Sequence, residues 1–257
     1  MNVARNLFSP FLFFIVLFSS CGKDDPDGSS NPPGLSDWEC PEEGIPVFEE
    51  DSGMIKVNAE MAEISATDWS FRTDVPDYEG EGFLVWEGSN SMGNPGNGLL
   101  TYKIRVNSPG TYRFIWRSAI TIGNNNTEHN DSWLRIPDAA HFYGMKNNGH
   151  IVYPKETELP PIPESAHQSN TTPNGAGADG WFKVYMNNAN GWRWQSRTSD
   201  HDAHDIYAVF THPGIYTVEI SGRSQGHSID AFVLFNESRN QNEVTDSEEP
   251  FSSVECL

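Results

Sequence analysis

Short runs in which apolar and polar residues alternate, each followed by a turn signal, restrict the fold of this chain more than any other feature. In Leu100–Val106 every second residue is apolar, and the residues between them are Thr, Lys and Arg. Pro109-Gly110 then turns the chain, and the same period resumes from Tyr112 to Trp116. A period of two places the apolar side chains on one face of a β-strand. The pattern therefore predicts strands that are buried on one face.

The same signals recur along the rest of the chain. Pro213-Gly214 precedes the alternating run Tyr216–Ile220, and no run with a helical period exceeds two turns. The chain also contains 22 Gly and 17 Pro, which makes turns frequent. These signals predict an all-β fold, a β-sandwich with long loops. The further strand candidates are Met54–Glu60, Gly82–Trp86, Ser132–Ile136, Trp181–Met186, Ile206–Phe210 and Ser228–Phe235.

Composition divides the chain into a core and polar flanks. Residues 21–50 are rich in Asp, Ser, Pro and Gly, which is typical of a flexible tether. Residues 51–236 carry the strand patterns and are expected to form one sandwich domain, while residues 237–257 are expected to form an acidic tail, loosely ordered unless Cys256 ties it down. Inside the domain, His141–Gly180 shows no strand pattern. A long irregular segment of this kind is usually functional.

Residues 1–20 have the three parts of a signal peptide. A short region carrying Arg5 leads into the apolar run Leu7–Phe18, which is too short to span a bilayer. The junction Phe18-Ser19-Ser20-Cys21 resembles a bacterial lipobox, and Gly22-Lys23-Asp24-Asp25 resembles the export signal of Bacteroidetes surface lipoproteins. These resemblances imply an outer-membrane lipoprotein that is anchored by a lipid on Cys21 and faces the extracellular side. An ordinary secretory peptide is the alternative.

Charge content limits the class of partner, and cysteine content limits the possible disulfides. The chain has 36 acidic and 16 basic residues, a balance that argues against nucleic acid because phosphates require Lys and Arg. Spare carboxylates suit Ca²⁺, although they also serve solubility alone. Besides Cys21, the chain holds Cys40 and Cys256, which bracket the predicted domain. They are expected to form a disulfide in an oxidising compartment or to remain free thiols.

Two polar segments are candidates for chemistry. The run Asp200–Asp205 contains three Asp and two His. Through His201 and His204 it could bind Zn²⁺ or another transition metal, act in acid–base chemistry, or contact sugar hydroxyls. Runs of this type also serve as turn caps, and the spacing matches no catalytic motif. His129-Asn130-Asp131 is a second segment of the same kind.

Tryptophan-rich sequence next to the first polar run suggests a stacking surface. Trp192 and Trp194 flank Arg193, and sugars stack their C–H faces on aromatic rings. Alternation places both rings on one side of a strand, where they either face solvent or fill the core. The residues expected to bind ligand are Trp192, Trp194, Arg193, Asp202, His204, Asp205, His129, Asp131 and Trp133.

The order of several strand-end motifs resembles carbohydrate-binding modules of families 6 and 35. Val57–Glu60 opens the domain, Gly110–Phe114 follows a Pro turn, and Gly214–Ile220 leads into His227–Asp230. The resemblance covers about 120 residues of strand ends. It implies a galactose-binding-like jelly roll, of the kind found beside polysaccharide-degrading enzymes.

The same resemblance implies a structural Ca²⁺ site at Asn58, Glu60 and Asp230. Oxygen ligands on adjacent strands suit Ca²⁺. Asn58 stands where the family has an acid, and ordinary hydrogen bonding of polar strand residues is the alternative for all three.

The leading interpretation is a surface-exposed lipoprotein with a non-catalytic carbohydrate-binding domain. It would capture a polysaccharide or oligosaccharide for polysaccharide utilisation, with degrading enzymes as neighbours and no role for nucleic acid. One alternative is a glycan lyase or hydrolase that uses Asp200–Asp205, and glycoside hydrolysis would need two suitably separated carboxylates. The other alternative is a protein-binding adhesion module.

Overall fold

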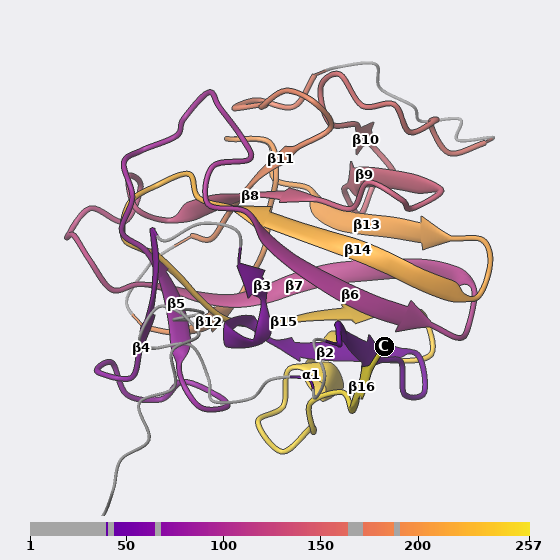
Figure 1. Cartoon of the computed structure of the whole chain (residues 1–257). Coiled ribbons are helices and arrows are strands. Elements are labelled where there is room, and N and C mark those ends of the chain that lie inside the picture. The colour runs from indigo at the N-terminus through magenta and orange to yellow at the C-terminus, as the bar shows by residue number, and fades with distance from the viewer. Residues whose placement is uncertain (1–39, 41–43, 65–67, 164–171, 188–190) are drawn as a thin grey trace, which may run out of the picture. The chain divides into compact units, whose positions relative to one another are not determined.

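Two β-sheets packed face to face form the folded part of the chain (Figure 1). The computed structural model describes residues 40, 44–64, 68–163, 172–187 and 191–257. The expected signal peptide, the lipidation residue Cys21 and most of the tether lie outside the described residues. No helix in the described part is long and apolar enough to cross a membrane. The all-β sandwich predicted from the alternating runs is confirmed.

The first sheet, called sheet A, has mainly antiparallel neighbours, but its strand β1 runs parallel to β6. The short strand β3 (Glu63–Ile64) pairs with β6 beside this path. In order across the sheet the strands are β11 (Phe182–Tyr185), β8 (Asp131–Arg135), β14 (Gly214–Ser221), β6 (Leu100–Val106), β1 (Pro46–Glu49) and β16 (Val254–Cys256).

The second sheet, called sheet B, is antiparallel along its main path. Two strands join it off the path: β12 (Arg193–Trp194) pairs with β7, and β2 (Met54–Asn58) pairs with β15. The main strands in order are β10 (Ile151–Val152), β9 (His141–Met145), β13 (Asp205–Phe210), β7 (Gly110–Ile120), β15 (His227–Phe235), β5 (Phe83–Trp86) and β4 (Trp69–Arg72).

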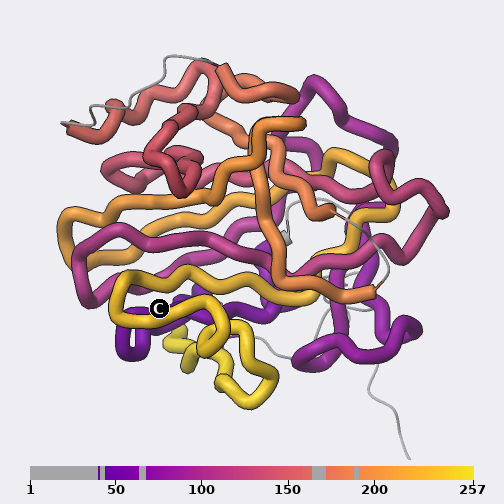
Figure 2. The backbone as a smooth tube through the Cα atoms, turned by 180° about the vertical axis from the view of Figure 1, so that it is seen from behind, coloured from indigo at the N-terminus to yellow at the C-terminus, as the bar shows by residue number. Residues whose placement is uncertain are grey.

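The main core lies between the two sheets and follows the sequence pattern. Alternate residues of β6 are buried, and the outward residues between them are partly exposed. Strand β15 differs because all nine of its residues are buried. The C-terminal segment, which includes helix α1 (Gln241–Val244), covers its outer face (Figure 2). Val244 packs there with Met54, Ile115, Val233 and Phe235 in a second apolar cluster.

One part of the chain is more regular than the sequence indicated. His141–Gly180 was expected to lack strands, yet it begins with β9, which pairs with β13 in sheet B, and continues into β10. The alternation is hidden because Tyr143 on the outer face is a large aromatic residue, as is Phe142 on the inner face. Gly144 adds no side chain to the pattern. A Cβ there would lie 2.8 Å from a Thr198 methyl, so the close approach of the two segments requires glycine.

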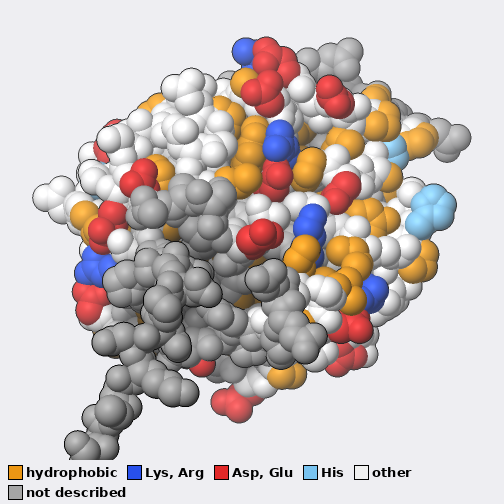
Figure 3. Space-filling model, viewed as in Figure 1, with side chains coloured by type: hydrophobic (Ala, Val, Ile, Leu, Met, Phe, Trp, Pro, Cys, Tyr) orange, Lys and Arg blue, Asp and Glu red, His pale blue; other side chains and the backbone are white. Residues whose placement is uncertain are grey.

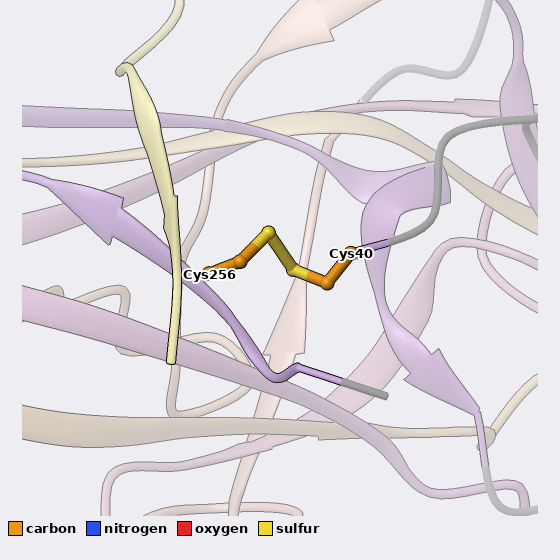
Figure 4. The surroundings of a disulfide bond; sticks show 2 residues. All are labelled: Cys40 and Cys256. Atoms are coloured by element: carbon orange, nitrogen blue, oxygen red, sulfur yellow. A yellow bond between two sulfur atoms is a disulfide. The ribbon is translucent and has the colours of Figure 1, made fainter. Parts of the chain in front are cut away.

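The domain also extends beyond the expected limits of residues 51 and 236. Strand β1 lies within the predicted tether, and β16 lies within the predicted tail, where it pairs with β1. A disulfide joins Cys40 to Cys256, as one of the two sequence-based alternatives had it (Figure 4). The side chain of Lys56 also holds the C-terminal segment, because it donates to the backbone oxygens of Asp246 and Glu249. These contacts make the acidic tail part of the fold.

Candidate functional site

A polar pocket of about 440 Å³ lies beside β11, at one edge of sheet A. The loop before β8 contributes Asn130, the strand contributes Lys183 and Tyr185, and the loop before β13 contributes Asp200 and His201. The other lining residues are Thr127, Asn187 and Ala203. The structure thus brings together the two polar segments that the sequence analysis identified separately, 129–131 and 200–205. The face of the molecule seen in Figure 3 carries acidic and basic side chains scattered among hydrophobic ones.

Lys183 holds the wall of this pocket in place. Its Nζ lies 2.7 Å from both carboxylate oxygens of Asp200 and 3.4 Å from Oδ2 of Asp131. The same ammonium lies 5.6 Å from the centre of the Tyr185 ring. Burial raises the pKa of Tyr185, and its hydroxyl donates to the backbone oxygen of Ser199 at 3.3 Å. The charged groups are therefore paired, and the pocket presents hydrogen-bonding groups beside an aromatic ring.

The ion pairs behind the pocket explain the positions of Asp131 and Trp133. Asp131 is only 1% exposed, and its carboxylate accepts from Arg223 at 2.5 Å and from the hydroxyl of Ser224. The Arg223 guanidinium lies 5.0 Å from the centre of the Trp133 ring. Trp133 is fully buried, and its indole N–H donates to the Ser91 backbone oxygen. Both were expected to bind ligand. Because neither side chain is exposed, they support the pocket from inside and do not contact a ligand.

An unusual backbone shape presents Asp200 and His201. Ser199 and His201 have φ angles of 67° and 58°, in the left-handed region that non-glycine residues seldom adopt. Asn174 holds the loop from outside, donating its amide to the Asp200 backbone oxygen at 2.8 Å. Such strain persists only where the surrounding contacts fix it, and it concentrates at functional sites.

Trp192 and Trp194 lie away from this pocket and do not line it. The indole N–H of Trp192 donates to the Pro76 backbone oxygen, and its ring meets Phe83 edge-on at 4.9 Å. Trp194 packs against the second apolar cluster, and the ammonium of Lys56 lies 5.5 Å from its ring centre. Both rings are partly buried and brace a neighbouring loop, which answers the question of surface or core that the sequence left open. Arg193 between them is exposed.

The carboxylates of the run Asp200–Asp205 are each paired with a cation. Besides the pair of Asp200 with Lys183, Asp202 contacts Lys146, and Asp205 contacts Arg113 at 3.0 Å and also Arg197. The hydrogen bond from Lys146 lowers the pKa of Asp202. A glycosidase acid needs a raised pKa, so Asp202 is not suited to that role.

The two histidines that were expected to bind ligand, His129 and His204, are held by backbone oxygens. The Nδ1 atom of His129 lies 2.5 Å from the Gln225 oxygen, and the ring packs over Gly123. His204 is completely buried, and its Nδ1 atom faces the Asp202 backbone oxygen. Neither residue lines the pocket.

The three residues of the expected metal site converge under the loop 77–81. Glu60 accepts from the backbone N–H of Glu81 at 3.1 Å, and Asp230 accepts from that of Glu79 at 3.1 and 3.0 Å. Glu60 lies in a 3-10 turn, η2 (Ala59–Met61), so strand alternation is not what directs its side chain. A Cβ on Gly80 would come within 2.9 Å of both Glu60 and Asn58, which shows how tightly the loop covers them.

The donor atoms of this cluster fit a hard cation in part. Asn58 Oδ1 and Glu60 Oε2 are buried and have no hydrogen-bond partner among the described residues. Burial raises the pKa of Glu60 to about 8, and the nearby carboxylates of Asp230 and Glu81 add to the shift. Asp230 differs because the Arg117 guanidinium already supplies a counter-charge. Two free oxygens therefore suit Ca²⁺, while the third ligand is shared with an arginine.

Comparison with known proteins gives similarity of fold only. No protein-family model and no curated protein matches the chain. Among solved structures, a β-(1,4)-mannanase with a family 35 module from Podospora anserina is 14% identical, with a TM-score of 0.41 over 76% of this chain and 30% of that one. The chain thus spans less than a third of that enzyme's length.

Two isolated modules are similar over nearly their whole length. A family 35 carbohydrate-binding module from Clostridium thermocellum is 17% identical, with a TM-score of 0.39 over 71% of this chain and 98% of the module. A module of the Cellvibrio mixtus lichenase, solved with cellotriose, is 11% identical, with a TM-score of 0.35 over 72% and 98%. The neighbours are thus of the family 6 and family 35 type that the strand-end motifs resemble. At these scores they assign no ligand, metal or site residue to this chain.

Proposed function

We propose that this domain binds a sugar residue of a polysaccharide or oligosaccharide in the pocket beside β11 and does not cleave it. The observation that carries the proposal is the convergence of amide, carboxylate, ammonium and imidazole groups on one cavity next to a tyrosine ring. Its volume of about 440 Å³ lies within the range of small-molecule sites. A ligand rich in hydroxyls can exchange its hydrogen bonds to water for bonds to these groups.

Two exposed lining residues test this proposal with little risk to folding. We expect His201→Ala and Asn187→Ala each to weaken binding of a recognised polysaccharide roughly fivefold, since one hydrogen bond contributes about 1 kcal/mol. His212→Ala is the matched control, because His212 is an exposed histidine in the turn between β13 and β14. A polysaccharide panel in affinity gels finds the ligand, and calorimetry measures the affinities.

The same experiment separates binding from the alternatives. Unchanged affinity in both variants would remove the pocket from the proposal. New reducing ends or unsaturated products during incubation would favour the enzyme alternative. If the whole panel fails to bind, the adhesion-module alternative takes its place.

The cellular role is proposed from the sequence motifs. We propose that a lipid on Cys21 anchors the protein in the outer membrane, facing outward, where it captures glycan for neighbouring polysaccharide-degrading enzymes. Cys21→Ala should then move the protein from the membrane fraction to the soluble fraction, and added protease should degrade the wild type on intact cells. Retention of the variant in the membrane would contradict the anchor.

Ca²⁺ is proposed as a structural cofactor at Asn58, Glu60 and Asp230. The support is the pair of unpartnered buried oxygens on Asn58 and Glu60. A bound cation would supply the positive charge that these oxygens lack and would fix the loop 77–81 against the sandwich. It has no assigned part in contacting the glycan.

A further inference from the structure

Three potential metal ligands meet outside the glycan pocket and outside the proposed Ca²⁺ site. His150 lies at the end of the turn between β9 and β10, while Asp202 and His204 lie in the loop before β13. One ligand atom from each lies within 4.8 Å of the others. Strands β9 and β13 are paired, with Met145 opposite Asp205, so the turn after one strand lies beside the loop before the other.

The orientation of His204 fixes which of its ring nitrogens carries the lone pair that a metal ligand needs. Its Nδ1 atom faces the backbone oxygen of Asp202, which can only accept a hydrogen bond, so Nδ1 carries the proton. Its Nε2 atom therefore has the lone pair, and this atom faces His150 Nδ1 at 2.8 Å. A metal-binding histidine commonly donates its other N–H to a backbone carbonyl in this way. The side chain is completely buried, which holds the ring in place.

The other two ligands are reachable from solvent and are set by local structure. His150 and Asp202 are both partly exposed. Gly149, with φ 82°, allows the tight turn that places His150, whose backbone N–H is capped by Asn148. A second cavity of about 440 Å³ lies on this side of the loop, with the lining residues Met145, Lys146, Asn147, Asn148, Arg197, Ala203 and Asp205. None of the three ligands lines that cavity, but the partial exposure of His150 and Asp202 lets an ion reach them without opening the core.

We propose that His150, Asp202 and His204 bind a divalent transition-metal ion of the Zn²⁺ class. Two imidazole nitrogens and one carboxylate oxygen form a ligand set that Zn²⁺ accepts and Ca²⁺ does not favour, and water would complete a tetrahedral shell. With bonds of about 2.0–2.1 Å, the two nitrogens would move apart to about 3.3 Å. The ion would also replace the ammonium of Lys146 as the partner of Asp202.

This assignment changes which histidines act together. The sequence suggested His201 with His204, but His201 lines the glycan pocket, and His150 from a different hairpin takes its place. The proposed site does not depend on glycan binding, so the two can fail independently.

Calorimetric titration of the chelator-treated protein with Zn²⁺ tests the assignment. We expect the wild type to bind at this site, and His150→Gln and Asp202→Asn each to weaken that binding at least tenfold. His201→Gln, in the same loop as Asp202, is the matched control, and Glu60→Gln controls for binding at the other proposed metal site. Both controls should keep the wild-type affinity. Co²⁺ gives a second readout, since its visible absorption reports imidazole coordination in the wild type but not in His150→Gln.

Thermal melts of the metal-free proteins show whether each variant is folded before titration. Zn²⁺ should raise the melting temperature of the wild type and leave that of His150→Gln unchanged. Equal Zn²⁺ affinity in wild type, His150→Gln and Asp202→Asn would overturn the proposal. Loss of binding in His201→Gln with retention in His150→Gln would overturn it as well, because the ion would then use the other histidine.

Discussion

Two buried carboxylates in this domain have opposite surroundings. Asp131 and Glu60 are 1% and 2% exposed, so both have left water almost completely. Asp131 contacts two cations, Arg223 and Lys183, and a serine hydroxyl. Within the described part of the chain, Glu60 accepts a backbone hydrogen bond from Glu81, lies near other carboxylates, and leaves Oε2 without a partner. The first carboxylate is neutralised by the chain itself, whereas the second requires a proton or an added cation.

The largest loss of stability is expected at Asp131, whose charge is already paired. Asp131→Asn leaves the guanidinium of Arg223 without its carboxylate partner, while Lys183 keeps its pair with Asp200. Breaking a buried pair in this way costs about 3–5 kcal/mol of unfolding free energy. Urea denaturation of wild type and variant measures the difference.

An exposed ion pair provides the control for that measurement. Asp74 pairs with Arg72 at the surface, and its side chain is 56% exposed. Asp74→Asn should cost far less than Asp131→Asn, because water screens the pair. An equally small loss in Asp131→Asn would mean that Asp131 is not a buried, paired charge, and the comparison would fail.

Acid should destabilise the fold through a second buried group, His227, which lies close to Asp131. His227 is completely buried, with Nδ1 2.8 Å from the Ser132 hydroxyl, and burial lowers its pKa from 6.5 to about 4. The folded state keeps this histidine neutral, while the unfolded state takes up a proton below pH 6.5. Stability should therefore fall as the pH drops from 6.5 to 4, by up to about 3 kcal/mol, and this contribution should be constant above pH 6.5.

A pH series of denaturation curves checks this expectation. His227→Gln should flatten the slope between pH 6.5 and 4, and the exposed control His212→Gln should leave it as in the wild type. The charge of Asp131 opposes the lowering of the His227 pKa, so in Asp131→Asn the loss of stability caused by His227 should extend to lower pH. The same slope in wild type and His227→Gln would assign the acid sensitivity to other groups.

The response to Ca²⁺ should distinguish Glu60 from Asp131. If Ca²⁺ binds at Asn58 and Glu60, free ion at a hundred times its dissociation constant stabilises the fold by about 2.7 kcal/mol. Chelation should remove that gain and Glu60→Gln should abolish the response, while Asp74→Asn should respond like the wild type. A melting temperature that changes with neither chelator nor Ca²⁺ would show that Glu60 is accommodated by protonation alone.

The strands were predictable because their signal is local. Alternation in Leu100–Val106 and Gly214–Ser221 depends only on neighbouring residues, as do the Pro-Gly turns at which the chain passes from one sheet to the other. Strand β9 was missed because its outer face carries Tyr143 and its inner face includes Gly144, which removes the contrast that alternation depends on. The order of the C-terminal segment was expected only on the condition that Cys256 ties it down, because it depends on long-range contacts, a disulfide and a buried lysine.

The site was only half predictable for a related reason. The polar runs near Asn130 and Asp200 were found by composition, but their meeting depends on strand order in sheet A and on the path of the loop before β13. Lys183 and Tyr185 were missed, although a lysine inside the apolar run Trp181–Met186 was a visible signal. The sequence analysis favoured tryptophans over tyrosine as sugar-stacking residues because tryptophan has the larger ring. A sequence does not show that these rings pack against Phe83 and Lys56.

The smallest effect is expected beside the loop that covers Glu60. Arg193 is exposed on β12, between two tryptophans that pack inward. Arg193→Ala removes a solvated charge, so the unfolding free energy should change by no more than about 0.5 kcal/mol. Glycan affinity should also remain at the wild-type value, because Arg193 does not line the pocket beside β11. Calorimetry alongside His201→Ala makes the contrast direct. A tenfold loss of glycan affinity in Arg193→Ala, with full binding in His201→Ala, would place the glycan site at β12 and its two tryptophans instead of in the pocket beside β11.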